Sequence, residues 1–142
     1  MAAAAERYDA DFWLGRKRVV LLAEDDAPTR TLVAEFLRAN GLSVVEAVNA
    51  DEAMAVFASN TLVDLVFTDV VMPGSMNGIA LAGWVSQHHP HIPILITSAA
   101  PEAMSANATN RCFLVKPYEL RDIEALIHRL LLGPPDPPKS TE

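Results

Sequence analysis

The chain has 142 residues, a length typical of one domain and too short for two ordinary ones. Hydrophobic residues make up 51% and charged residues 20%, and no apolar run reaches the roughly 20 residues needed to span a bilayer. The net charge of -7 argues against nucleic acid as a partner, because phosphate binding needs clustered Lys and Arg. With Cys112 as the only cysteine and no secretory signal, we expect a cytoplasmic protein with no membrane partner.

Strands and helices are predicted to alternate along the chain. Apolar runs bounded by charged or turn-forming residues predict five buried strands, at 19–23, 43–47, 63–68, 93–97 and 112–115. Apolar residues at helical spacing predict helices at about 28–39, 50–59, 79–88 and 120–131. The segment from Pro101 to Arg111 leaves space for one more helix, which we expect to be short or irregular.

Local signals mark several of the helix ends. Pro28 suits the first turn of a helix, and Asn40 followed by Gly41 predicts the end of that helix. Asn49 with Glu52 three residues later resembles a capping box, in which two side chains satisfy free amides at a helix start. These signals support the alternation of strands and helices.

The alternation predicts the fold class and the domain limits. Strands separated by helices favour an α/β fold with a doubly wound parallel sheet and helices on both faces, because each crossover helix packs back onto the sheet with one hand. We expect an N-terminal extension at 1–17, one domain at 18–132 and a Pro-rich tail at 133–142.

Chemically active side chains follow four of the predicted strands. Glu24, Asp25 and Asp26 come after the first strand, and Asp69, Ser98 and Lys116 lie at the ends of the third, fourth and fifth. The carboxyl ends of parallel strands share one edge of a sheet, where ligands usually bind. Converging carboxylates can hold Mg²⁺, and a carboxylate nucleophile, a metal, a Lys and a hydroxyl suit phosphoryl transfer.

Four segments in order resemble the response-regulator receiver family over roughly Arg18 to Leu132: VVLLAEDDAPTR, LVFTDVVMPGSMNG, PILITSAA and FLVKPY. The resemblance implies the flavodoxin-like strand order 2-1-3-4-5. It also implies that Asp69 is the phosphoacceptor and that Lys116 pairs with the phosphoryl group. Mg²⁺ would be held by Glu24, Asp25, Asp69 and the backbone carbonyl of Val71, and Asp26 falls one place beyond the family's acidic pair.

The resemblance also implies residues that report phosphorylation. Thr97 and Ser98 are adjacent hydroxyls, and Ser98 matches the family's switch position better. Phe113 matches the aromatic switch position, where many members carry Tyr. Pro117 matches a proline that the family often holds after a cis bond. Polar side chains that orient a hydrolytic water in the family are replaced here by Val71 and Ala100, which predicts slow autodephosphorylation.

The resemblance implies a phosphoacceptor switch and not an enzyme. Its expected phosphodonor is a histidine kinase or a histidine phosphotransfer protein, and its expected output is contact with another protein, as a stand-alone receiver. A phosphorelay carrier and a small metal-dependent phosphatase with an Asp nucleophile remain the alternatives. We expect a monomer or a weak dimer, because the segment between the fourth and fifth strands is short.

Overall fold

The computed structural model describes residues 16–100 and 111–132 of the chain. Within them, five parallel strands form one sheet in the order β2-β1-β3-β4-β5. The strands are β1 (Val19–Ala23), β2 (Ser43–Ala47), β3 (Leu65–Asp69), β4 (Ile94–Ser98) and β5 (Arg111–Val115). The helices of this part are α2 (Ala27–Ala39), α3 (Ala50–Ala58), α4 (Gly78–His88) and α5 (Leu120–Leu132). The predicted doubly wound sheet and its strand order are confirmed.

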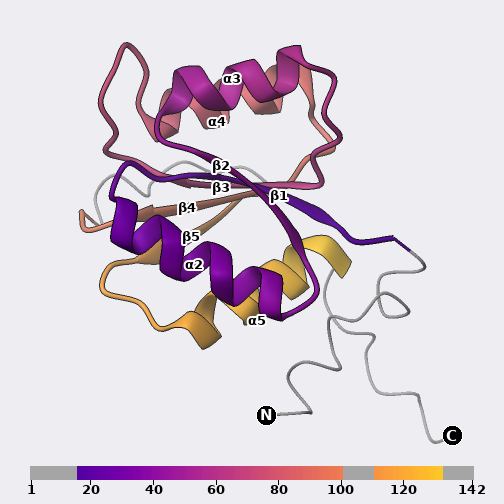
Figure 1. Cartoon of the computed structure of the whole chain (residues 1–142). Helices are drawn as coiled ribbons and strands as arrows, with labels where there is room; N and C mark the ends of the chain where they lie inside the picture. The colour runs from indigo at the N-terminus through magenta and orange to yellow at the C-terminus, as the bar shows by residue number, and fades with distance from the viewer. Residues whose placement is uncertain (1–15, 101–110, 133–142) are drawn as a thin grey trace, which may run out of the picture.

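Helices cover both faces of the sheet. Figure 1 shows α3 and α4 on one face and α2 and α5 on the other, with the strands between them. Side chains alternate between the faces along each strand, so β1 sends Leu21 toward α3 and α4 and Leu22 toward α2 and α5. Burying each such Leu contributes about 1.5–3 kcal/mol, which makes these two cores the main source of stability.

Helix α2 ends at Ala39, just before Asn40 and Gly41, as the sequence predicted. Gly41 has a φ of 87°, a left-handed conformation that glycine adopts without steric penalty. The Leu42 amide donates to the Leu37 carbonyl and the Gly41 amide donates to the Arg38 carbonyl, both at 3.1 Å. This is the Schellman arrangement, and it turns the chain from α2 into β2.

The start of α3 carries the predicted cap with one change. The Asn49 side chain accepts from the Glu52 amide at 2.8 Å, as expected of a residue that caps a helix. The Glu52 carboxylate reaches back to the amide of Val48 at 2.9 Å, one residue earlier than the usual capping box. Both side chains therefore satisfy amides before the helical bonds begin.

Two predicted strands begin later in the structure than the sequence suggested. β3 begins at Leu65 and not at residue 63, and the Asp64 carboxylate before it accepts from the Val19 amide at 2.7 Å. β4 begins at Ile94, because Pro93 has no amide to donate and only its carbonyl pairs, accepting from Val66 at 3.0 Å.

Some predictions fall outside the described residues. These are the short or irregular helix expected from residue 101, the tail after residue 132 and most of the N-terminal extension.

β5 begins at Arg111, one residue before the predicted strand. None of the helices in the described part of the chain combines the length and the apolar character that a membrane span requires.

Candidate functional site

The candidate site lies at the carboxyl ends of the central strands. β1 and β3 are neighbours in the sheet, and Ala23 near the end of β1 pairs with Thr68 of β3. Asp69, the last residue of β3, pairs with Thr97 of β4. The next residue after β1 is Glu24, whose amide donates to the Ala47 carbonyl at 3.0 Å and so continues the pairing with β2. The topology therefore brings Glu24 and Asp69 together.

Three carboxylates converge at this edge. Glu24, Asp25 and Asp69 each offer an oxygen, and these oxygens lie within 4.8 Å of one another. Glu24 is 3% exposed and Asp69 is 7% exposed, whereas Asp25 faces solvent. Charges held this close and shielded from water repel one another, so the cluster needs a cation nearby.

Lys116 supplies part of that positive charge. It follows β5, and its Nζ lies 2.7 Å from Oδ2 of Asp69 and 3.6 Å from Oε1 of Glu24. Burial by itself lowers the pKa of Lys116, but the hydrogen bond and the charge of Asp69 outweigh it, so the pKa is raised and the ammonium stays charged. The bond between Lys116 and Pro117 is cis, as the resemblance implied.

Backbone contacts hold Glu24 in place. The Arg30 guanidinium of α2 donates to the Glu24 carbonyl at 2.8 Å, and the Asp26 amide donates to the Glu24 carboxylate at 3.1 Å. Burial raises the pKa of Glu24, and the nearby Asp69 charge raises it further. A buried carboxylate that is disfavoured in its charged form gains from a cation, which would stabilise that form.

Asp26 caps a helix, whereas its neighbours Glu24 and Asp25 belong to the carboxylate cluster. It precedes α2, and its carboxylate accepts from the Thr29 amide at 3.0 Å, which caps the helix. The hydrogen bond from the Thr29 hydroxyl, together with the one from the Thr29 amide, lowers the pKa of Asp26. The cluster of carboxylate oxygens formed by Glu24, Asp25 and Asp69 does not include it.

The expected switch residues and Val71 occupy distinct positions on the strands β4 and β5 and after β3. The Ser98 hydroxyl accepts from the Ala100 amide at 3.0 Å and donates to its carbonyl at 3.3 Å. Phe113 on β5 packs against the core beneath α3 and α4. Val71 is 74% exposed, and its amide donates to Oδ1 of Asp69 at 3.4 Å. The structure brings Val71 to the Asp69 carboxylate, whereas the Ser98 hydroxyl bonds within its own turn.

Gly78 is a structural requirement of the site that the sequence analysis did not single out. It begins α4, and its amide donates to the Val70 carbonyl at 2.8 Å. A Cβ at this position would lie 1.9 Å from the backbone carbonyl oxygen of Asp69. Only glycine lets the helix start this close to the acidic residue. Asn77 before Gly78 signals the start of a helix, whereas no local signal in the sequence gives the approach of Gly78 to Asp69.

The carboxylate cluster suits a divalent cation of the Mg²⁺ type. It offers oxygen ligands only, and the Lys116 ammonium pairs with two of its three carboxylates, so it carries excess negative charge. Burial disfavours the charged form of Glu24 and so raises its pKa. A bound cation would stabilise that charged form, so the burial of Glu24 also favours cation binding. The residues present therefore fit a hard cation.

Comparisons with known proteins agree with this geometry. The family model "Response regulator receiver domain" matches residues 20–128. The chain is 38% identical over 120 residues to the response regulator protein FleR of Pseudomonas aeruginosa, covering 80% of this chain and 24% of that protein. It is 31% identical to the DNA-binding transcriptional regulator NtrC of Salmonella typhimurium, covering 82% and 25%. The chain thus spans about a quarter of these relatives.

Solved structures share the fold over nearly their whole length. The receiver domain of the hybrid histidine kinase CckA has 28% identity and a TM-score of 0.69, covering 80% of this chain and 98% of that one. The response regulator protein TrrA of Thermotoga maritima, solved in complex with Mg²⁺-BeF, has 27% identity and a TM-score of 0.71, covering 82% and 100%.

Fold and site together define an α/β module with an acidic pocket at the carboxyl edge of its sheet, which is typical of a phosphoaccepting Asp site. The chain belongs to the response regulator receiver domain family. Members of this family are generally switches that accept a phosphoryl group, and they take part in two-component signalling.

Proposed function

We propose that this chain accepts a phosphoryl group on the carboxylate of Asp69, donated by a histidine kinase or a histidine phosphotransfer protein. The proposal rests above all on one observation, the buried Asp69 carboxylate 2.7 Å from the Lys116 ammonium. A carboxylate can act as a nucleophile toward phosphorus without a general base, and a fixed ammonium neutralises charge on the transferred oxygens.

Mg²⁺ is the proposed cofactor. The carboxylates of Glu24, Asp25 and Asp69 would hold it, with the backbone carbonyl of Val71 as a fourth protein ligand. Bound there, the cation would neutralise developing negative charge on the phosphoryl oxygens. This chain's own residues would set its place, because Arg30 fixes the backbone of Glu24 and β3 fixes Asp69.

The output is proposed to be protein contact. Ser98 and Phe113 are the proposed switch residues; Ser98 ends β4, the strand that pairs with β3, and Phe113 lies on β5, one strand farther out. On phosphorylation the Ser98 hydroxyl would leave its bonds to the Ala100 backbone and donate to a phosphoryl oxygen. The core around Phe113 would then repack and alter the adjoining surface. We infer a cytoplasmic location, because receiver domains are typically cytoplasmic.

Labelling with a small phosphodonor tests the acceptor. Acetyl phosphate with Mg²⁺ should add one base-labile phosphoryl group per chain, and peptide mapping should place it on Asp69. Asp69→Asn should abolish the label and EDTA should prevent it. Asp122→Asn is the matched control, because Asp122 lies exposed on α5. Undiminished labelling of the Asp69 variant, or full labelling in EDTA, would overturn the proposal.

A further inference from the structure

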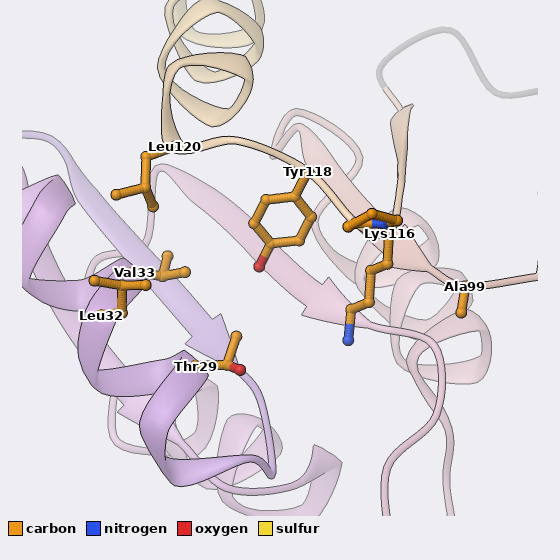
Figure 2. Close-up of a pocket in the computed structure, with 8 residues that line it drawn as sticks. Thr29, Leu32, Val33, Ala99, Lys116, Tyr118 and Leu120 are labelled. Atoms are coloured by element: carbon orange, nitrogen blue, oxygen red, sulfur yellow. The ribbon is translucent and has the colours of Figure 1, made fainter.

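A hollow opens directly beside the acidic site. It lies between α2 and the segment that joins β5 to α5, and its volume is about 480 Å³. Apolar side chains form most of its wall, including Leu32, Val33 and Leu120. Three polar side chains also line it, Thr29, Lys116 and Tyr118 (Figure 2). A hollow with apolar walls weakens the screening of any charge placed at its inner end.

Tyr118 directs its hydroxyl into this hollow. Figure 2 shows that the Tyr118 hydroxyl and the Lys116 ammonium both point from the segment after β5 toward the ends of the central strands. The Tyr118 ring packs against the core between the sheet and helices α2 and α5, which fixes its direction. The Tyr118 hydroxyl thus lies on the same segment as the Lys116 ammonium, which pairs with the Asp69 carboxylate at 2.7 Å.

The hydroxyl is available as a donor. Burial raises the pKa of Tyr118, and the negative charges of Glu24 and Asp69 raise it further, whereas Lys116 opposes them. The hydroxyl therefore keeps its proton at neutral pH. Within residues 16–100 and 111–132 no hydrogen bond uses it. A half-buried donor on which the charges of both carboxylates act is placed for a ligand with acceptor oxygens.

We propose that Tyr118 is a phosphoryl-binding residue, whose hydroxyl donates a hydrogen bond to an oxygen of the phosphoryl group as it passes to Asp69. This inference rests on the proposed function above. In the step, an Asp69 oxygen forms a bond to phosphorus, the bond from phosphorus to the donor breaks, and its electron pair leaves with the donor. Tyr118 keeps its proton throughout and supplies only the hydrogen bond.

Physical reasoning favours a role in the transfer step itself. Charge spreads over the phosphoryl oxygens during transfer, and a fixed donor stabilises it without moving. Lys116 supplies a charge, and Tyr118 would add a directed neutral donor. A hydrogen bond to a charged group contributes about 1.5–3 kcal/mol, equivalent to roughly a 10- to 150-fold change in rate.

Two variants of Tyr118 separate the hydroxyl from the ring. Tyr118→Phe keeps the ring and its packing but removes the donor, whereas Tyr118→Leu removes both. With acetyl phosphate and Mg²⁺, we expect the maximal rate of Asp69 phosphorylation to fall about tenfold or more in both variants. The acetyl phosphate concentration at half-maximal rate should change less than threefold, and the Mg²⁺ affinity and the unfolding temperature of Tyr118→Phe should match wild type.

The outcomes are distinguishable. Wild-type labelling at Asp69 with an unchanged maximal rate for Tyr118→Phe would overturn this inference and leave the proposed function standing. A loss confined to Tyr118→Leu would likewise overturn it, because that pattern indicates packing by the ring. If Asp69 of the wild type is not the labelled residue, the proposed function fails and this inference fails with it.

Discussion

The Lys116 ammonium lies 2.7 Å from the Asp69 carboxylate, although 47 positions separate the two residues in the chain. The sheet order explains the contact, because β4 alone separates β3 from β5. Lys116 directly follows β5, and its amide donates to the Ser98 carbonyl at 2.9 Å, which fixes the start of its side chain. Strand pairing therefore positions both Asp69, the candidate acceptor, and the Lys116 ammonium.

Gly78 offers a sharp test of how closely α4 approaches Asp69. Gly78→Ala would place a methyl group 1.9 Å from the Asp69 carbonyl oxygen, so the backbone at Asp69 must move. We expect a loss of about 2–4 kcal/mol in the free energy of unfolding, comparable to other severe steric changes in a core. Chemical denaturation measures this loss, and the rate of acetyl phosphate labelling should fall with it.

Gly83→Ala is the matched control for Gly78→Ala. Gly83 lies in the same helix and is exposed, and an added Cβ would meet nothing within 4 Å. Alanine in an exposed helix interior is about 0.5–1 kcal/mol more favourable than glycine, so this variant should be as stable as wild type or more so. Equal effects of the two substitutions would contradict the close approach.

Asp64 should contribute to stability in a pH-dependent way. Its carboxylate accepts from the Arg16 guanidinium at 2.7 and 2.9 Å and from the Val19 amide at 2.7 Å. Burial alone raises the pKa of Asp64, but these bonds outweigh it and the pKa is lowered from 3.8. The stabilisation is therefore fully present above about pH 4 and is lost as the pH falls through the lowered pKa.

Asp64→Asn should reveal that dependence. At pH 7 we expect the variant to lose about 1–2 kcal/mol in the free energy of unfolding, because the charge-assisted pair with Arg16 and the partly buried hydrogen bond from the Val19 amide both weaken. Denaturation at a series of pH values should show the gap from wild type closing in acid. Glu119→Gln is the control, since its pair with Arg121 is exposed and is worth little. Parallel stability curves for wild type and Asp64→Asn would refute the assignment.

Asp25 and Asp26 should differ in their effect on metal binding. Asp25 belongs to the carboxylate cluster, whereas Asp26 caps α2. We expect Asp25→Asn to weaken Mg²⁺ binding about tenfold or more, as expected for the loss of a charged oxygen ligand. Asp26→Asn should leave Mg²⁺ binding nearly unchanged, and it should also keep the cap because Asn caps helices well. Calorimetric titration with Mg²⁺ measures both affinities.

Asp26→Ala completes this comparison. It removes the cap and should lower the unfolding temperature while Mg²⁺ affinity stays near that of wild type. A larger loss of Mg²⁺ affinity in either Asp26 variant than in Asp25→Asn would show that the acidic pair is shifted by one residue.

The phosphorylated state is predicted to be long-lived. Hydrolysis needs a water in line with phosphorus, and the flanking side chains of Val71 and Ala100 cannot hydrogen-bond one. Val71 is also 74% exposed beside the Asp69 carboxylate, where it would cover part of the approach. The double variant Val71→Asn, Ala100→Glu should release phosphate about 5- to 150-fold faster, since one placed group is worth about 1–3 kcal/mol. An unchanged release rate would show that Val71 and Ala100 do not set the lifetime of the phosphorylated state.

The sequence alone was enough to predict the fold class and the edge at which the site lies. Strand and helix periods depend on local hydrophobic patterning, which is readable residue by residue, and crossover rules then limit the topology. Both acidic segments, and Lys116 with Pro117, lie next to such strands and were therefore found. The capping role of Asn49 was also legible, because capping depends on residues close in sequence.

Only the tertiary structure decided what depends on distant segments meeting. The Asp25 and Asp69 carboxylates come from segments far apart in the sequence, and the pairing of β1 with β3 brings them together. The approach of Gly78 to Asp69, the bond from Arg30 to Glu24 and the direction of Tyr118 arise from packing between elements. Patterning reports which face of an element is buried, whereas contact distances follow from how the elements pack in three dimensions.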